Sequence, residues 1–254
     1  MAQPDDLSVL TRPAAAPDDV VAYGADADQI ADVRFGAEGA HGTHGASERP
    51  LVLIMHGGFW RPRYDRAHTG PMAEAIAAAG WTVASVEYRR VPGEPDKTLQ
   101  DVSEALAKLP AKISHHNGKV VLVGHSAGGH LVLWLSVARR TPQLIGTLAL
   151  APAADLRLAR ELNLGDGAVE LFLGADPKTR PDVDPRQLPS PRIPTVVVQG
   201  DRDVVVRPAV AESYVSAHPS VRLVRLTGVG HFAPIDPLSA VWPTILRELL
   251  KMSR

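Results

Sequence analysis

Short apolar runs alternate with helix-forming stretches from residue 51 to the end of the chain. Unbroken runs of Val, Ile and Leu predict strands buried on both faces, as in a parallel sheet covered by helices. The predicted strands are Leu51–Met55, Thr82–Glu87, Lys119–Val123, Leu144–Ala151, Thr195–Gln199 and Val221–Leu226. The predicted helices are Pro71–Ala79, Lys97–Leu109, Ala127–Arg139, Ala209–Ala217 and Pro237–Met252, the last with Asp236 as its cap. The pattern predicts one α/β domain over residues 1–254, with a mostly parallel sheet and helices on both faces.

Two segments fall outside this alternation. Residues 1–19 are rich in Ala, Pro and Asp and predict a flexible, loosely held N-terminal arm, followed by antiparallel strands at Val20–Tyr23 and Ala31–Phe35. Residues 152–194 contain many prolines and one short apolar cluster, Glu170–Leu173. We interpret them as a short, proline-rich, partly irregular insertion that lies like a cap over the functional site and leaves its pocket accessible.

A G-x-S-x-G sequence, Gly124-His125-Ser126-Ala127-Gly128, lies between a predicted strand and a predicted helix. A sharp turn at this point exposes the serine hydroxyl, and the flanking glycines let neighbouring backbone pack closely. Such a hydroxyl attacks well only beside a base and near donors that can hold negative charge. The spacing predicts Ser126 as a nucleophile.

The sequence His56-Gly57-Gly58-Phe59-Trp60 directly follows the strand predicted at Leu51–Met55. Hydrolysis of an ester or amide passes through a tetrahedral oxyanion, which backbone N–H groups can stabilise. One donor comes from the residue after the nucleophile, here Ala127, and others come from the loop that follows the third strand. We predict an oxyanion hole made by Gly58, Phe59 and Ala127; a Gly-Gly turn that merely ends a strand is the alternative.

An acid and a histidine follow two later strands. His231 would take the proton of the serine and later give it to the leaving group. A buried carboxylate would hold its imidazole in the required tautomer. Asp201 and Asp203 compete for this role, and Asp203 is preferred because Asp201 directly follows Gly200 and is suited to shaping the turn. The order Ser, Asp, His is that of α/β-hydrolases.

These motifs together resemble the esterase and arylformamidase group of the α/β-hydrolase superfamily, from about Leu51 to the C-terminus. Kynurenine formamidases carry a similar H-G-G-x-W loop and a G-H-S-A-G-x-H-L turn, and small bacterial carboxylesterases are also similar. Further matching segments are Glu87-Tyr88-Arg89, Gly129-His130-Leu131, Gly230-His231-Phe232 and Ile235-Asp236-Pro237. Phe59 departs from hormone-sensitive-lipase relatives, which usually have a third glycine there. The resemblance implies an α/β-hydrolase fold and a metal-independent Ser126–Asp203–His231 triad without a cofactor.

The few aromatic residues gather near the predicted oxyanion loop. Trp60 and Tyr64 are candidates for the substrate-binding wall, with plain packing as the alternative for Trp60. This grouping favours cleavage of small or aromatic carboxylic esters, with N-formylkynurenine-type formamides as the near alternative. The same scaffold would also suit a perhydrolase, an aminopeptidase or a non-catalytic binding protein. His56, His125 and His130 are interpreted as structural.

Composition narrows the partners to small molecules. Lys and Arg number 27 against 28 Asp and Glu, without a basic stripe, which argues against nucleic acid and anionic membranes. The chain has no cysteine, which excludes disulfides, and no signal-peptide pattern, so a cytoplasmic location is expected. His41 and His44 predict a solvated loop rather than a metal site. Such hydrolases often pair through their C-terminal edge, which leaves a homodimer open.

Overall fold

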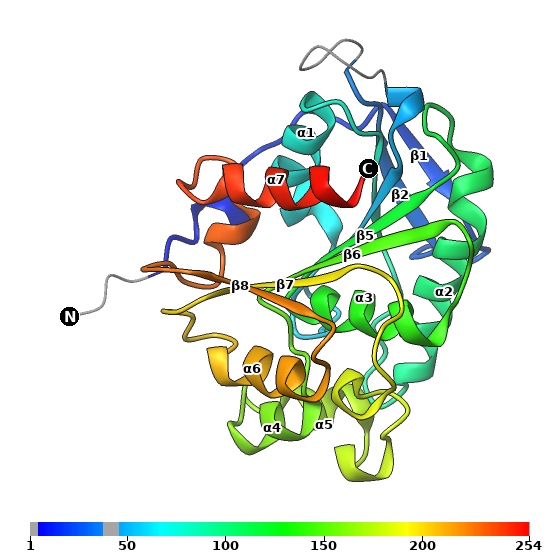
Figure 1. Ribbon diagram of the computed structural model, residues 1–254. Helices are drawn as coiled ribbons and strands as arrows, with labels where there is room; N and C mark the ends of the chain where they lie inside the picture. Colours follow the sequence, from blue (N-terminus) through cyan, green and yellow to red (C-terminus); the bar gives the residue numbers. More distant parts are fainter. Residues whose placement is uncertain (1–4, 38–45, 254) are drawn as a thin grey trace.

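The computed structural model describes residues 5–37 and 46–253, so His41 and His44 lie outside the described residues. Eight strands form one sheet in the order β1-β2-β4-β3-β5-β6-β7-β8, antiparallel at β1, β2 and β4 and parallel from β4 onward (Figure 1). The strands are β1 Asp19–Ala22, β2 Ile30–Arg34, β3 Leu51–Met55, β4 Val83–Val86, β5 Val120–His125, β6 Leu144–Leu150, β7 Thr195–Gly200 and β8 Arg222–Leu226. The predicted mostly parallel sheet is confirmed.

Helices cover both faces of this sheet. The α-helices are α1 Gly70–Ala78, α2 Pro95–Lys112, α3 Ala127–Ala138, α4 Leu156–Glu161, α5 Ala168–Leu173, α6 Pro208–Ala217 and α7 Trp242–Met252. Helices α1 and α7 lie on one face, and α2, α3 and α6 lie on the other with α4 and α5 (Figure 1). Strands β3 and β5 are buried throughout, which explains the unbroken apolar runs Leu51–Met55 and Val120–Val123. No helix in the described part of the chain is both long and apolar enough to cross a membrane.

The strand register brings the predicted site segments to one edge of the sheet. Met55 at the end of β3 pairs with Gly124 near the end of β5, so the His56–Trp60 loop begins beside the turn that holds Ser126. Gly200 pairs with Leu226, so the loops after β7 and β8 also leave the sheet together. Residues that are far apart in sequence therefore meet at the carboxyl ends of parallel strands.

The C-terminal helix begins later than predicted. It starts at Trp242, and the residues before it form a 3-10 turn, Ala233–Ile235, and an irregular segment. Asp236 does not cap the helix: its carboxylate pairs with Arg12 and accepts a hydrogen bond from the Leu238 amide at 2.8 Å. The Asp-Pro pair is a good helix start in isolation, but this ion pair with the N-terminal segment engages the carboxylate elsewhere.

Candidate active site

The predicted nucleophile lies on a strained turn between β5 and α3. Ser126 has φ 56° and ψ −116°, a region that non-glycine residues rarely adopt. A Cβ on Gly124 would lie 2.2 Å from the carbonyl oxygen of Gly128. A Cβ on Gly128 would lie 1.9 Å from the carbonyl oxygen of Met55. Only glycine fits at both positions, as the sequence motif indicates.

His231 and Asp203 form a buried pair. Nδ1 of His231 donates to Oδ2 of Asp203 at 2.7 Å. Oδ1 of Asp203 accepts from the amides of Val205 at 2.9 Å and Val206 at 2.8 Å, which fixes the plane of the carboxylate. The neutral imidazole thus carries its proton on Nδ1, and Nε2 keeps a free lone pair. This is the tautomer that a general base for a serine hydroxyl requires.

The two candidate carboxylates have different surroundings. Asp203, not Asp201, contacts the His231 ring. Asp201 is exposed and accepts a hydrogen bond from the amide of Gly228 at 2.7 Å, so it shapes the adjoining loop. Gln199, which we did not identify from the sequence, is buried and donates from Nε2 to Oδ2 of Asp203 at 3.0 Å. No spacing rule would have identified Gln199, because in the sequence it is only the last residue of an apolar strand.

Ser126 and His231 line the same pocket, which has a volume of about 370 Å³. Gly58, Phe59 and Tyr64 line it from the loop after β3. The remaining lining side chains include Leu10, Thr11, His68, Val205 and Phe232. Apart from the histidines and the hydroxyls, the side chains that line it are apolar or aromatic, which suits an uncharged organic group. Tyr64 therefore lies where the sequence predicted a pocket wall.

Trp60 and the insertion do not line this pocket. Trp60 is buried and stacks on Phe172 of α5, with the ring centroids 4.6 Å apart. Nε1 of Trp134 donates a hydrogen bond to the carbonyl of Asp182, which belongs to the insertion, at 2.9 Å. Trp60, predicted as a candidate for the substrate-binding wall, does not line this pocket; its ring packs inward, which is the packing alternative. The insertion supports the back of the loop rather than capping Ser126.

The loop after β3 contacts the turn at Ser126. A Cβ on Gly57 would lie 3.1 Å from Cβ of Ser126. Gly58 has φ 111°, and Phe59 has φ 53°. Within residues 5–37 and 46–253, no protein group accepts a hydrogen bond from the amides of Gly58, Phe59 or Ala127. These amides are therefore free to serve as donors, and the oxyanion hole stays a prediction.

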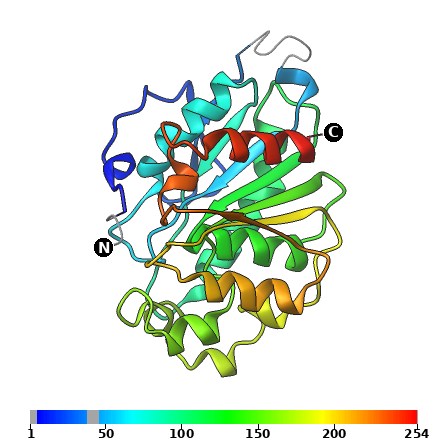
Figure 2. The same cartoon turned by 60° about the vertical axis from the view of Figure 1, so that its left-hand side comes forward.

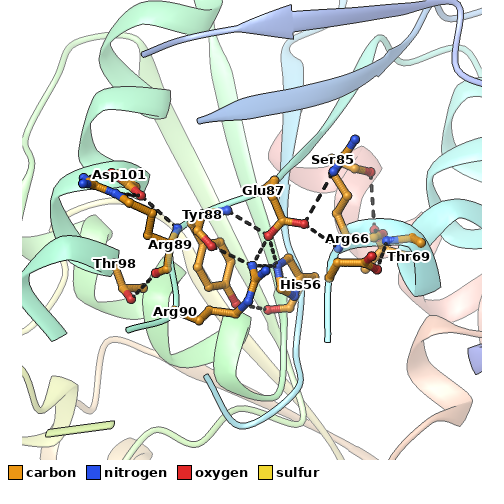
Figure 3. A network of polar contacts seen from close by, with 12 residues as sticks. His56, Arg66, Thr69, Ser85, Glu87, Tyr88, Arg89, Arg90, Thr98 and Asp101 are labelled. Carbon is orange, nitrogen blue, oxygen red and sulfur yellow. Dashed lines mark hydrogen bonds and ion pairs between the residues drawn. The ribbon is translucent and has the colours of Figure 1, made fainter. Parts of the chain in front are cut away.

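A buried polar network anchors the start of this loop (Figure 3). Nε2 of His56 donates to Oε1 of Glu87 at 3.0 Å, and Arg90 pairs with the same carboxylate. The amide of Arg66 donates to the other carboxylate oxygen at 3.1 Å. The hydroxyl of Tyr88 donates to the carbonyl of His56 at 2.7 Å. Glu87 thus ties β4 to the residue that precedes the two glycines.

Charge compensation keeps this carboxylate ionised. Burial alone would raise the pKa of Glu87, but its hydrogen bond from His56 and the charges of His56 and Arg90 lower the pKa to about 2. A buried carboxylate with these partners costs less than an unpaired one, and removing a partner would leave it uncompensated. The network therefore fixes the position of His56, where the loop begins.

Two further histidines, His125 and His130, make the structural contacts expected from the sequence. Nε2 of His125 donates to the carbonyl of His231 at 3.0 Å, and Nε2 of His130 donates to the carbonyl of Val183 at 2.9 Å. Burial lowers the pKa of His130 to about 4 and that of His125 well below its usual range. Both rings stay neutral at pH 7. Among the described residues, no group of three or more His, Asp or Glu side chains is arranged to hold a metal ion.

Neutral buried histidines make the fold sensitive to acid. The pKa of His130 is lower in the folded protein than in the unfolded chain, where it is near 6.5, so the unfolded chain binds protons more tightly. The contribution of His130 to stability is therefore fully present above pH 6.5 and declines as the pH falls toward 4. Between pH 7 and pH 5, the free energy of unfolding of the wild type should fall by about 2 kcal/mol more than that of His130→Gln. Urea unfolding at both pH values measures this difference; equal losses in the two proteins would contradict it.

Comparison with known proteins identifies the family. A family model described as the alpha/beta hydrolase fold matches residues 52–234, which include the loop after β3, Ser126, Asp203 and His231. The chain belongs to the alpha/beta hydrolase fold family. The predicted fold class and the resemblance to esterases and arylformamidases are both confirmed at this level.

Curated relatives of this chain include esterases and a formamidase. Kynurenine formamidase of Salmo salar is 32% identical over 113 residues, which cover 42% of this chain and 38% of that protein. Esterase LipC of Mycobacterium tuberculosis is 24% identical over 212 residues, which cover 72% of this chain and 52% of that protein. The matched regions thus span about half or less of these relatives' own length.

Solved structures show the same architecture. Esterase B from Lactobacillus rhamnosis has a TM-score of 0.72 and 20% identity, and the match covers 95% of this chain and 88% of that chain. Thermophilic esterase Est2 from Thermogutta terrifontis has a TM-score of 0.68 and 18% identity, and the match covers 96% of this chain and 94% of that chain. At these identities the likeness establishes the fold alone.

Proposed function

We propose that this protein is a serine hydrolase that cleaves small or aromatic carboxylic esters through an acyl-enzyme. The observation that carries the proposal is the position of Ser126, on a strained turn in the pocket that His231 also lines. His231 is in the tautomer that accepts a proton at Nε2, because Asp203 holds its Nδ1–H. The hydrolase family to which the chain belongs supports the same conclusion.

In the proposed reaction, Oγ of Ser126 attacks the acyl carbonyl while Nε2 of His231 takes the hydroxyl proton. Asp203 keeps the imidazole oriented and stabilises the imidazolium that forms. The amides of Gly58, Phe59 and Ala127 hold the oxyanion of the tetrahedral intermediate. The imidazolium then protonates the departing alcohol, and a water molecule activated by His231 releases the acid from Ser126. All of these groups belong to the protein chain, so the reaction needs no metal.

The substrate class follows from the pocket. A volume of about 370 Å³ with few charged side chains suits a short acyl group or a single aromatic ring. The rings of Phe59, Tyr64 and Phe232 line it, and flat groups can stack against them.

An arylformamidase is the second candidate. The 32% identity to a kynurenine formamidase, together with the aromatic pocket wall, favours it. Formamide and ester hydrolysis use the same nucleophile, base and oxyanion donors, so the two candidates differ in the fit of the substrate.

Turnover of p-nitrophenyl acetate and of N-formylkynurenine distinguishes these candidates. We expect kcat/KM to be higher for the ester. A hundredfold preference for the formamide would reverse the ranking while leaving the serine chemistry in place. Hydrolysis of neither compound, nor of a wider set of acyl esters and aryl formamides, would favour a non-catalytic binding protein.

A further inference from the structure

The segment from Asp5 to Pro17, called here the N-terminal arm, is part of the active-site region. It includes a 3-10 turn, Ser8–Leu10, whose Val9 is buried against the apolar layer that α1 and α7 share with the sheet. Figure 2 shows the arm in dark blue at one end of the sheet. Leu10 and Thr11 line the pocket that contains Ser126. Where the sequence predicts a loosely held arm, this segment has specific contacts with the rest of the fold.

One end of the arm contacts the loop that carries His231. Oδ2 of Asp5 accepts a hydrogen bond from the backbone N–H of His231 at 2.6 Å. Arg12 forms a two-point ion pair with Asp236, whose second contact, from the guanidinium to Oδ2, measures 3.1 Å. Both pairs join residues more than 220 positions apart in sequence. They hold the arm against the segment that follows the catalytic histidine.

The other end of the arm is fixed to β2 and α1. Arg34 donates to the carbonyls of Ala15 and Ala16, the latter at 3.1 Å. A Cβ on Gly70 would lie 3.0 Å from Cβ of Ala14, so a close contact joins the arm to the start of α1. Leu10 and Thr11 lie between Asp5 and Arg12 in sequence, so one anchor precedes them and the others follow. Their position in the pocket is thus set by anchors on both sides.

We propose that Leu10 is a specificity-determining residue, because the anchored arm makes its side chain a wall of the pocket at Ser126. This inference rests on the proposed esterase function and names the residue that limits the length of the acyl chain. The side chain of Leu10 is partly buried and packs against the core layer that includes Val9, so it is supported from behind. Shortening it enlarges the pocket, and a larger residue at Thr11 reduces it.

A chain-length series tests this role. The substrates are p-nitrophenyl acetate, butyrate, hexanoate and octanoate, and the proteins are wild type, Leu10→Ala, Thr11→Leu and Leu7→Ala. One methylene in an apolar pocket changes kcat/KM by about 10- to 200-fold. We therefore expect Leu10→Ala to raise the octanoate-to-acetate ratio of kcat/KM about tenfold or more, and Thr11→Leu to lower it. Leu7 is on the same arm but is exposed and does not line the pocket, so Leu7→Ala should leave the ratio unchanged.

Each outcome has a distinct meaning. Thermal melting of every variant shows whether it is folded at the assay temperature. If folded Leu10→Ala and Thr11→Leu lose activity equally on all four esters, or keep the wild-type profile, the wall assignment is wrong while the esterase function stands. If Leu7→Ala shifts the profile as much as Leu10→Ala, the effect belongs to the arm as a whole and the assignment to Leu10 is overturned. If the wild-type protein hydrolyses none of the four esters, the proposed function fails first, and this inference fails with it.

Discussion

Replacing Ser126 by alanine should reduce kcat/KM for p-nitrophenyl acetate by roughly 10⁵-fold, to the level of the assay background. The hydroxyl is the only group of the proposed triad that bonds to the acyl carbon, so nothing replaces it. The fold should be retained, because alanine removes one oxygen from a turn whose shape the neighbouring glycines fix. Steady-state kinetics with substrate in excess measures this change.

Ser136 provides the matched control for this variant. It is on α3, the helix that follows Ser126, and is buried, but its hydroxyl donates to the carbonyl of Leu133 at 2.6 Å and does not line the pocket. Ser136→Ala should keep kcat/KM within about twofold of the wild-type value. Its hydroxyl makes no contact with the site, and substitutions away from a site have small effects. A large loss with Ser136→Ala, or substantial activity with Ser126→Ala, would contradict the assignment of the nucleophile.

Replacing Gly128 by alanine should destabilise the protein by about 3 kcal/mol or more. The new Cβ would lie 1.9 Å from the carbonyl oxygen of Met55 and 2.5 Å from that of His56. Relieving this overlap moves the end of β3 away from α3, and the loop after β3 moves with it. Both the free energy of unfolding in urea and kcat/KM of the folded protein should therefore fall.

Gly118 is a control position that distinguishes the effect of steric overlap on stability from the effect of backbone strain. It has φ 80°, a conformation that alanine adopts at a cost of about 1–2 kcal/mol, and a Cβ there would meet no atom within 4 Å. Gly118→Ala should lose this smaller amount of stability and keep kcat/KM. Equal stability losses in the two variants would mean that the close contact at Gly128 is not what requires glycine there.

The parts of the fold that could be predicted are those with a local sequence cause. Strands β3 and β5 are buried throughout, so Leu51–Met55 and Val120–Val123 are apolar without interruption. The turn at Ser126 needs glycine at fixed spacings, and this requirement is visible as a motif. The preference for Asp203 over Asp201 also has a local basis, because a carboxylate directly after Gly200 is well placed to shape the turn.

The parts that could not be predicted depend on contacts between distant residues. Trp60 lies beside Phe59 in sequence, but it stacks on Phe172, more than 100 positions away. Leu10 and Thr11 have no periodic pattern around them, and their place in the pocket depends on Asp5 and Arg12 meeting the His231 loop. Asp236 pairs with Arg12 instead of capping α7 for the same reason. Local spacing contains no information about such partners.

Covalent labelling with a fluorophosphonate tests most directly whether Ser126 is activated by His231. We expect one adduct per chain in the intact mass, located on Ser126 by peptide mapping. We also expect no adduct with Ser126→Ala and labelling slowed about a hundredfold or more with His231→Ala. An unlabelled wild-type protein, or an adduct on another residue with Ser126 unmodified, would contradict the activation of Ser126 by His231.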